Sequence, residues 1–173
     1  MTRYFSLVIT WGCRLLMVAL PVTSIYLLLD QPAFTRMVAS TTGLRVRWET
    51  VEPVQLYALW LLVTIYYALS VFGLNFLSRA FSSFARGDRF NTANSRNLRL
   101  FSILLFIQAL VTPLLFAISS VVLSLNHPAG EHMLAVRMGS PEITRAVLAM
   151  IFWTTSELLL EGSRLEEENR LFV

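Results

Sequence analysis

The sequence predicts an all-α membrane protein with four transmembrane helices, at about residues 4–29, 54–77, 98–125 and 143–162. A helix of about 20 residues crosses a hydrocarbon core of roughly 30 Å, and each of these runs is long enough to do so. The composition agrees, because 55% of the 173 residues are hydrophobic and only 14% are charged. The runs do not alternate as barrel strands would, so helices must satisfy the backbone in lipid. We expect one domain, 1–173.

The first helix is longer than the 7–15-residue apolar core of a signal peptide, and no clean small-residue cleavage site follows it. We therefore expect it to stay attached to the protein. It carries the only cysteine, Cys13, so the sequence predicts neither an intramolecular disulfide nor a cysteine-rich metal site. The last helix reaches about 20 residues only by including Glu157 and Glu161 near its inner end.

The distribution of arginines predicts the orientation. With both termini in the cytoplasm, eight arginines lie inside: Arg3, Arg79, Arg86, Arg89, Arg96, Arg99, Arg164 and Arg170. Five lie outside: Arg36, Arg45, Arg47, Arg137 and Arg145. The inner cluster between the second and third helices is adjacent to two membrane ends, where the positive-inside bias acts. We predict a multi-pass protein of the bacterial inner membrane with both termini in the cytoplasm.

Two segments outside the membrane resemble strands. Leu44, Val46 and Trp48 alternate with charged residues, which is typical of a half-buried strand, and a second strand-like piece covers 133–138. If the two segments pair, they form a small β-cap over the outer helix ends. Such a cap would sense a ligand or bind a partner, or it would be an ordered connector, which is the interpretation we favour.

Arg14 and Glu157 lie within apolar runs, where an unpaired charge is costly. Both fall in the inner half of the bilayer in the predicted topology, so the sequence predicts an ion pair between them. The alternative is that Arg14 extends by itself to a lipid phosphate while Glu157 faces interfacial water.

Catalytic and cofactor sites find little support. The two histidines, His127 and His132, share one outer loop, and no metalloprotease, nucleophile-elbow or phosphate-loop pattern occurs. Serine and threonine in the helices are better explained by hydrogen bonds between helices. We predict a non-enzymatic protein with no cofactor and no direct binding to nucleic acid.

Two cytoplasmic patterns remain. In the first, between the second and third helices, Gly87 is expected to end a helix that carries Phe81 and Phe84 on one face, and Asn91 or Thr92 to cap the next helix. Its key residues are Phe84, Gly87, Phe90, Asn94 and Leu98. The second lies in the tail, 163–173, and just before it; its key residues are Gly162, Leu165, Glu167, Glu168, Asn169, Leu171 and Val173. Basic residues of the loop are expected to contact Glu166 to Glu168, although exposed ion pairs contribute only about 0–1 kcal/mol.

These two patterns, on a four-span chain of this length, resemble the bacterial membrane family catalogued as domain of unknown function 2975. The resemblance implies a membrane protein that holds or signals to a small cytoplasmic helix-turn-helix transcription regulator. We therefore expect a regulator or sensor whose loop and tail form a docking surface. The alternative is a small oligomeric transporter or channel, and the sequence leaves the oligomeric state open.

Overall fold

The computed structural model describes the backbone of residues 2–44, 46–87, 91–128 and 130–171, and the side chains of 4–44, 46–87, 91–128 and 130–165. Its elements are α1 (Thr2–Leu29), α2 (Gln31–Thr42), the short 3₁₀ helix η1 (Trp48–Thr50), α3 (Pro53–Arg86), α4 (Thr92–Ser124) and α5 (Ser140–Leu171).

Four helices, α1, α3, α4 and α5, are long and apolar enough to cross a membrane, which confirms the four predicted spans. They extend beyond the predicted bounds at polar ends: α3 continues to Arg86 instead of 77, α4 begins at Thr92 instead of 98, and α5 covers Ser140–Leu171 instead of 143–162. Hydrophobicity marks the part of a helix that lies in lipid, whereas the helix itself continues until a residue such as Gly87 ends it. The chain is a multi-pass α-helical membrane protein.

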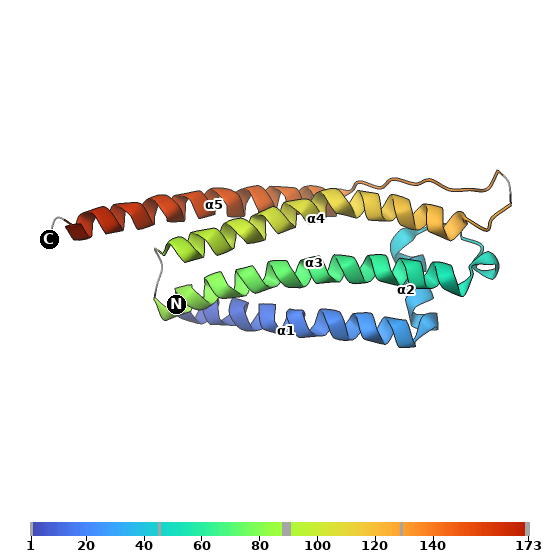
Figure 1. Cartoon of the computed structure of the whole chain (residues 1–173), viewed down its shortest axis with the longest axis horizontal. Coiled ribbons are helices and arrows are strands. Elements are labelled where there is room, and N and C mark those ends of the chain that lie inside the picture. Colours follow the sequence, from blue (N-terminus) through green and yellow to red (C-terminus); the bar gives the residue numbers. More distant parts are fainter. Residues whose placement is uncertain (1, 45, 88–90, 129, 172–173) are drawn as a thin grey trace.

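The four long helices lie in a row, in the order α1, α3, α4, α5, as Figure 1 shows. Each packs mainly on its neighbours in this order, so α1 and α5 occupy opposite edges. The end of the row where α1 begins, α3 connects to α4 and α5 finishes is called the terminal end here. The opposite end, with α2 and η1, is called the loop end.

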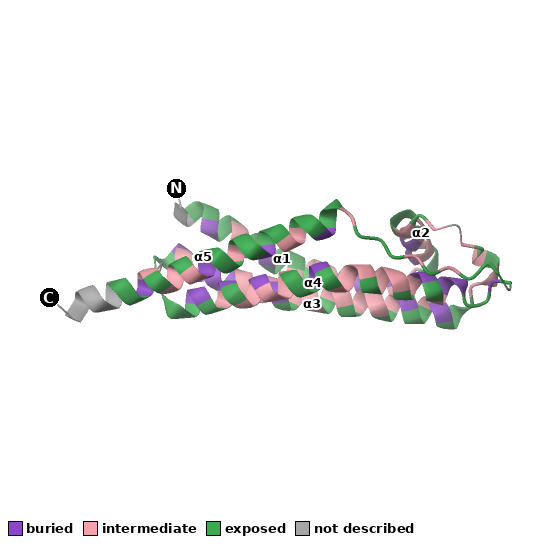
Figure 2. Ribbon diagram, turned by 90° about the horizontal axis from the view of Figure 1, so that it is seen from above, coloured by how far each residue is buried: buried purple, intermediate pink, exposed green. Residues whose placement is uncertain are grey.

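Packing within the row relies on small residues. The buried positions of α3 and α4 are dominated by serines and alanines, and in α5 the buried residues include Ala149 and Ser156. Large apolar side chains such as Leu61, Phe72 and Leu114 are more than half exposed (Figure 2). This distribution suits helices in lipid, where small residues allow close approach and large apolar residues face acyl chains.

The predicted β-cap is wrong, because the described residues contain no strand. In its place, the amphipathic helix α2 covers the loop end. Asp30 starts α2 by accepting a hydrogen bond of 3.0 Å from the amide of Ala33, and Gly43 ends it with φ +63°. Phe34 and Val38 of α2 are buried against the ends of the long helices.

Leu44, Val46 and Trp48 were expected to alternate along a strand, and they lie instead on a segment that pairs with no strand among the described residues. All three side chains pack on the apolar cluster at the loop end, so the period of two does report a buried face. The two outer loops also meet, through an ion pair of 3.1 Å between Arg47 and Glu131. They contact each other through side chains, and among their described residues no ladder of backbone hydrogen bonds joins them.

The second strand-like piece lies along a helix. Residues 131–139, called the extended segment here, run beside the end of α4. The amides of Met133 and Ala135 donate to the hydroxyls of Ser124 and Ser120, both at 2.9 Å. Two extended residues advance about 6.6 Å and four helical residues about 6 Å, so alternate backbone amides match serines four apart.

The extended segment also determines how far α5 reaches. Because residues 131–139 cover the outer part of α4, α5 begins partway along the row and passes beyond the terminal end (Figure 1). The hydroxyl of Ser95, in the first turn of α4, donates to the carbonyl of Ser156 at 2.7 Å. The 15 residues from 157 to 171 therefore extend about 22 Å past this contact.

Candidate functional site

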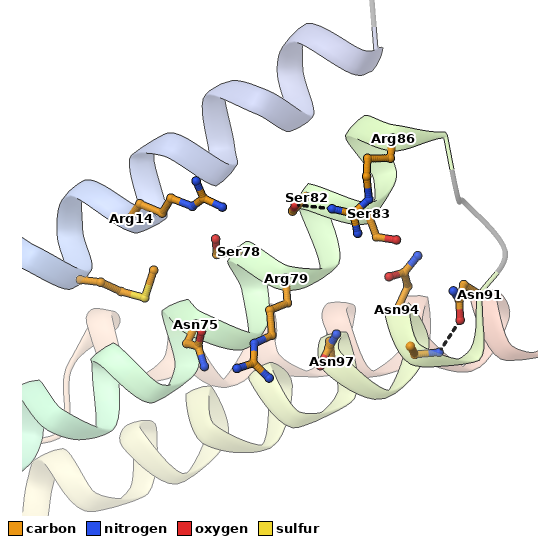
Figure 3. Close-up of a pocket in the computed structure, with 12 residues that line it drawn as sticks. Arg14, Asn75, Ser78, Arg79, Ser82, Ser83, Arg86, Asn91, Asn94 and Asn97 are labelled. Carbon is orange, nitrogen blue, oxygen red and sulfur yellow. Dashed lines mark hydrogen bonds between the residues drawn. The ribbon is translucent and has the colours of Figure 1, made fainter.

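A polar pocket of about 480 Å³ lies at the terminal end, between α1, α3 and α4 (Figure 3). Three arginines, four asparagines and three serines dominate its lining: Arg14, Arg79, Arg86, Asn75, Asn91, Asn94, Asn97, Ser78, Ser82 and Ser83. Met17 and Ala93 complete it, and none of the described lining residues is acidic. We call this the arginine pocket.

The end of α3 and the start of α4 build the pocket. Gly87 ends α3 in the left-handed conformation, with φ +100°. Glycine suits this position because the conformation is unfavourable for residues with a side chain. Asn91 caps α4 by accepting a hydrogen bond of 2.9 Å from the amide of Ala93. Both local predictions are confirmed, and the polar ends of the two helices lie side by side around the pocket.

Charge in the arginine pocket is not neutralised within the described residues, because none of its three arginines forms an ion pair there. Arg86 Nη1 donates to Ser82 Oγ at 3.1 Å, and the Arg14 guanidinium carbon lies 5.5 Å from the centre of the Trp11 ring. Figure 3 shows Arg14 and Arg86 pointing from different helices toward the space beside Ser82. The positive charge of these side chains favours binding of an anion in the pocket.

The predicted ion pair between Arg14 and Glu157 is not formed. Glu157 lies 3.6 Å from Arg99 on α4, and the Arg99 guanidinium carbon lies 4.7 Å from the centre of the Trp153 ring. Arg14 belongs to the opposite edge of the row, so α3 and α4 separate the two predicted partners. The prediction assumed a closed bundle in which the first and last helices touch.

The other predicted site residues divide between the pocket and the tail. Asn94 is 1% exposed and lines the pocket, and Leu98 is also buried on α4. Phe84 packs edge-to-face on Phe81, with ring centres 5.6 Å apart. Phe90 lies outside the described residues.

The tail residues lie on the part of α5 that passes the terminal end. Gly162 is half-buried and Leu165 is 61% exposed. The backbone of Glu167, Glu168, Asn169 and Leu171 is helical. Their side chains, Val173, and the predicted contacts of Glu166 to Glu168 with the basic loop lie outside the described residues.

Sequence reasoning missed the arginine pocket, although a signal was present. The polar positions of α3 recur every three or four residues and lie on one face of that helix: Asn75, the neighbours Ser78 and Arg79, the neighbours Ser82 and Ser83, and Arg86. A hydropathy average over consecutive residues does not reveal this polar face, because the residues between its members are apolar. Asn91, Asn94 and Asn97 repeat every three residues on α4 and face the same space.

A second charged group was also missed. Glu142 and Arg145, in the first turns of α5, form an ion pair of 3.6 Å. Arg145 donates to Thr112 Oγ1 at 3.2 Å and lies 6.0 Å from the ring of Tyr66. Thr112 is 12 residues before the end of α4, or about 18 Å, so this pair sits far from the loop end. The arginine count had placed Arg145 on the outer side, because the sequence gave no sign that α5 is displaced toward the terminal end.

No family model, curated protein or solved structure matches the chain. The fold and the site therefore define the class of protein by themselves: a multi-pass α-helical membrane protein with a cationic pocket at one end of its helix row.

Proposed function

We propose that the protein is a non-enzymatic regulator or sensor of the bacterial inner membrane, whose terminal end docks a cytoplasmic protein. The resemblance to domain of unknown function 2975 suggests that this partner is a small helix-turn-helix transcription regulator. The observation that carries the proposal is the projection of α5, which continues about 22 Å past the contact between Ser95 and Ser156. A helix that continues past the ends of its neighbours offers a surface that those helices do not cover.

The orientation rests on the arginine count of the sequence, with eight arginines on the side of the termini and five on the other. Without Arg145, which lies beside Thr112 and away from the loop end, the outer count falls to four and the bias keeps its direction. Topology reporters fused at residues 40, 88, 130 and 173 test it. Fusions at 88 and 173 should be active in the cytoplasm, and fusions at 40 and 130 in the periplasm. A periplasmic signal at residue 173 would place the projecting end of α5 in the periplasm and exclude a cytoplasmic partner.

Docking is best tested by site-specific photocrosslinking in intact cells. A photoreactive residue at Leu165, which is 61% exposed beyond the end of α4, should give a discrete adduct with a small soluble protein. The same residue at Met150, which is 57% exposed on the part of α5 between the contacts of Arg145 and Ser156 with α4, is the matched control and should meet only lipid or membrane proteins. Mass spectrometry of the adduct should identify a DNA-binding regulator.

Replacing Glu167, Glu168 and Asn169 with alanine should remove the adduct at Leu165 while leaving the amount of inserted protein unchanged. Docking is excluded if positions 165 and 150 give the same adducts, or if the triple substitution has no effect on them.

Transport by a small oligomer is the second candidate, and the pair formed by Glu142 and Arg145 favours it. Ionisable residues at membrane depth commonly mark ion or proton pathways. Purified protein in liposomes should then move protons or chloride, and Glu142→Gln should lower the flux. Liposomes that stay as tight as protein-free vesicles would remove this candidate.

A further inference from the structure

We propose that the arginine pocket binds a phosphate-bearing anion. The inference goes beyond the docking function and does not depend on it, because it concerns a pocket between α1, α3 and α4 and not the projecting part of α5. Its basis is three arginines from two helices around one space of about 480 Å³, without an acidic lining residue among those described.

The chemistry of the lining matches a phosphate group. Each guanidinium can donate two parallel hydrogen bonds to phosphate oxygens, and these charge-assisted bonds are about twice as strong as neutral ones. Asparagine amides and serine hydroxyls supply further donors in a pocket where Ser78 is 5% and Ser83 7% exposed. The pocket also adjoins the first turn of α4, whose positive dipole end favours negative charge.

Bringing three like charges together is unfavourable, and the described residues supply no counter-ion for them, so the arrangement favours an anion that compensates them. Arg14 illustrates this. Ser24 and Thr64 bond at 2.8 Å, which places Arg14, ten residues closer to the terminal end, beside the region of Asn75. Its side chain also lines the pocket with Ser82, nearer that end, so the guanidinium extends away from the apolar middle of the span.

The ligand can come from two sources, a lipid headgroup or a soluble phosphate. Position favours the headgroup. Trp11 is 65% and Tyr4 78% exposed on the same part of α1, and aromatic side chains of this kind gather at the membrane–water boundary, where lipid phosphates lie.

Binding to the purified full-length protein in dodecyl maltoside tests the proposal. The probes are dihexanoyl phosphatidic acid, dihexanoyl phosphatidylglycerol, inorganic phosphate and, as a zwitterionic control with the same chains, dihexanoyl phosphatidylcholine. We expect the anionic probes to bind with an affinity that falls as salt rises. Arg79→Gln and Arg14→Gln should each weaken that binding by about tenfold or more, which is the effect of losing one charge-assisted contact.

Arg164→Gln removes the same charge from an exposed position outside the pocket, and binding should change less than about twofold. Arg79→Lys keeps the charge without the planar fork, so its affinity should fall between those of the wild type and Arg79→Gln. Competition by inorganic phosphate on the wild type provides a readout that does not depend on how the variants fold.

The probes also separate the two sources. Tight binding of the anionic lipids with weak competition by inorganic phosphate identifies a lipid headgroup. Equal binding of inorganic phosphate with the same dependence on Arg79 identifies a soluble ligand, and either result supports the pocket. The proposal is overturned if Arg79→Gln binds as well as Arg164→Gln, or if the zwitterionic lipid binds as tightly as the anionic ones.

Discussion

The two serines that hold the extended segment lead to a quantitative prediction. Ser124 is 2% exposed and accepts a hydrogen bond of 2.9 Å from the amide of Met133; Ser120 is fully buried and does the same for Ala135. Alanine at either serine leaves a backbone N–H without a partner, at a cost of about 1–3 kcal/mol. A cost of about 2 kcal/mol makes local opening of residues 131–139 roughly 30-fold more frequent.

Hydrogen exchange measured by mass spectrometry on the purified protein reads this opening directly. Peptides that cover 131–139 should exchange roughly 30-fold faster in Ser124→Ala and in Ser120→Ala. Ser119→Ala is the matched control, since that hydroxyl bonds only the carbonyl of Leu115 in its own helix, at 2.8 Å. If Ser124→Ala exchanged no faster than Ser119→Ala, the serine hydroxyls would not be what attaches the segment to α4.

Two further predictions concern charged groups. A hydrogen bond from the amide of Ala33 holds the pKa of Asp30 below its usual 3.8, so this carboxylate stabilises α2 fully above pH 3.8 and loses its effect as pH falls through the lower folded-state pKa. Amide exchange in α2, corrected for intrinsic rates, should rise in that acid range, and Asp30→Asn should abolish the pH dependence. Because Glu157 pairs with Arg99, Arg14→Leu and Glu157→Leu should be additive in unfolding free energy within about 0.5 kcal/mol, and a larger coupling would restore the pair with Arg14.

What the sequence could predict depends on the range of the interactions involved. The four spans follow from local hydrophobicity, and Gly87 and Asn91 end and begin helices through contacts within a few residues. Helix α2 was missed although its signals are also local, with Asp30 before Pro32 at its start and Gly43 at its end. The alternating apolar residues that follow it, Leu44, Val46 and Trp48, were interpreted as a strand instead.

Partners across the fold could not be predicted in the same way. A period of two shows which side chains of an extended segment face the protein, and it does not show whether the backbone meets a strand or a row of serines on a helix. The Arg14 interaction failed for a similar reason. Charges at similar membrane depth are necessary for a pair, but the order of the helices decides whether they meet, and that order places α1 and α5 at opposite edges.

The surroundings of the pair formed by Glu142 and Arg145 test where α5 begins, because Arg145 reaches Thr112, and the pair is shielded, only if α5 begins beside the middle part of α4. The Glu142 side chain is 11% exposed and that of Arg145 30%, so the pair is better shielded than the pair formed by Arg99 and Glu157, at 48% and 43%. Glu142→Gln keeps an acceptor for the amide of Gly139, which bonds at 2.8 Å, but leaves Arg145 without a counter-charge.

Removing one partner of a fully buried pair costs about 3–5 kcal/mol, and the partial exposure of Arg145 lowers the expected loss for Glu142→Gln to about 1–3 kcal/mol. The double variant Glu142→Gln with Arg145→Gln removes both charges and should recover most of that loss. Equilibrium unfolding in mixed detergent micelles measures all three, with Glu157→Gln as the control at less than about 1 kcal/mol. A double-mutant coupling below about 0.5 kcal/mol would mean that this pair is no better shielded than an exposed one, which contradicts its position beside Thr112.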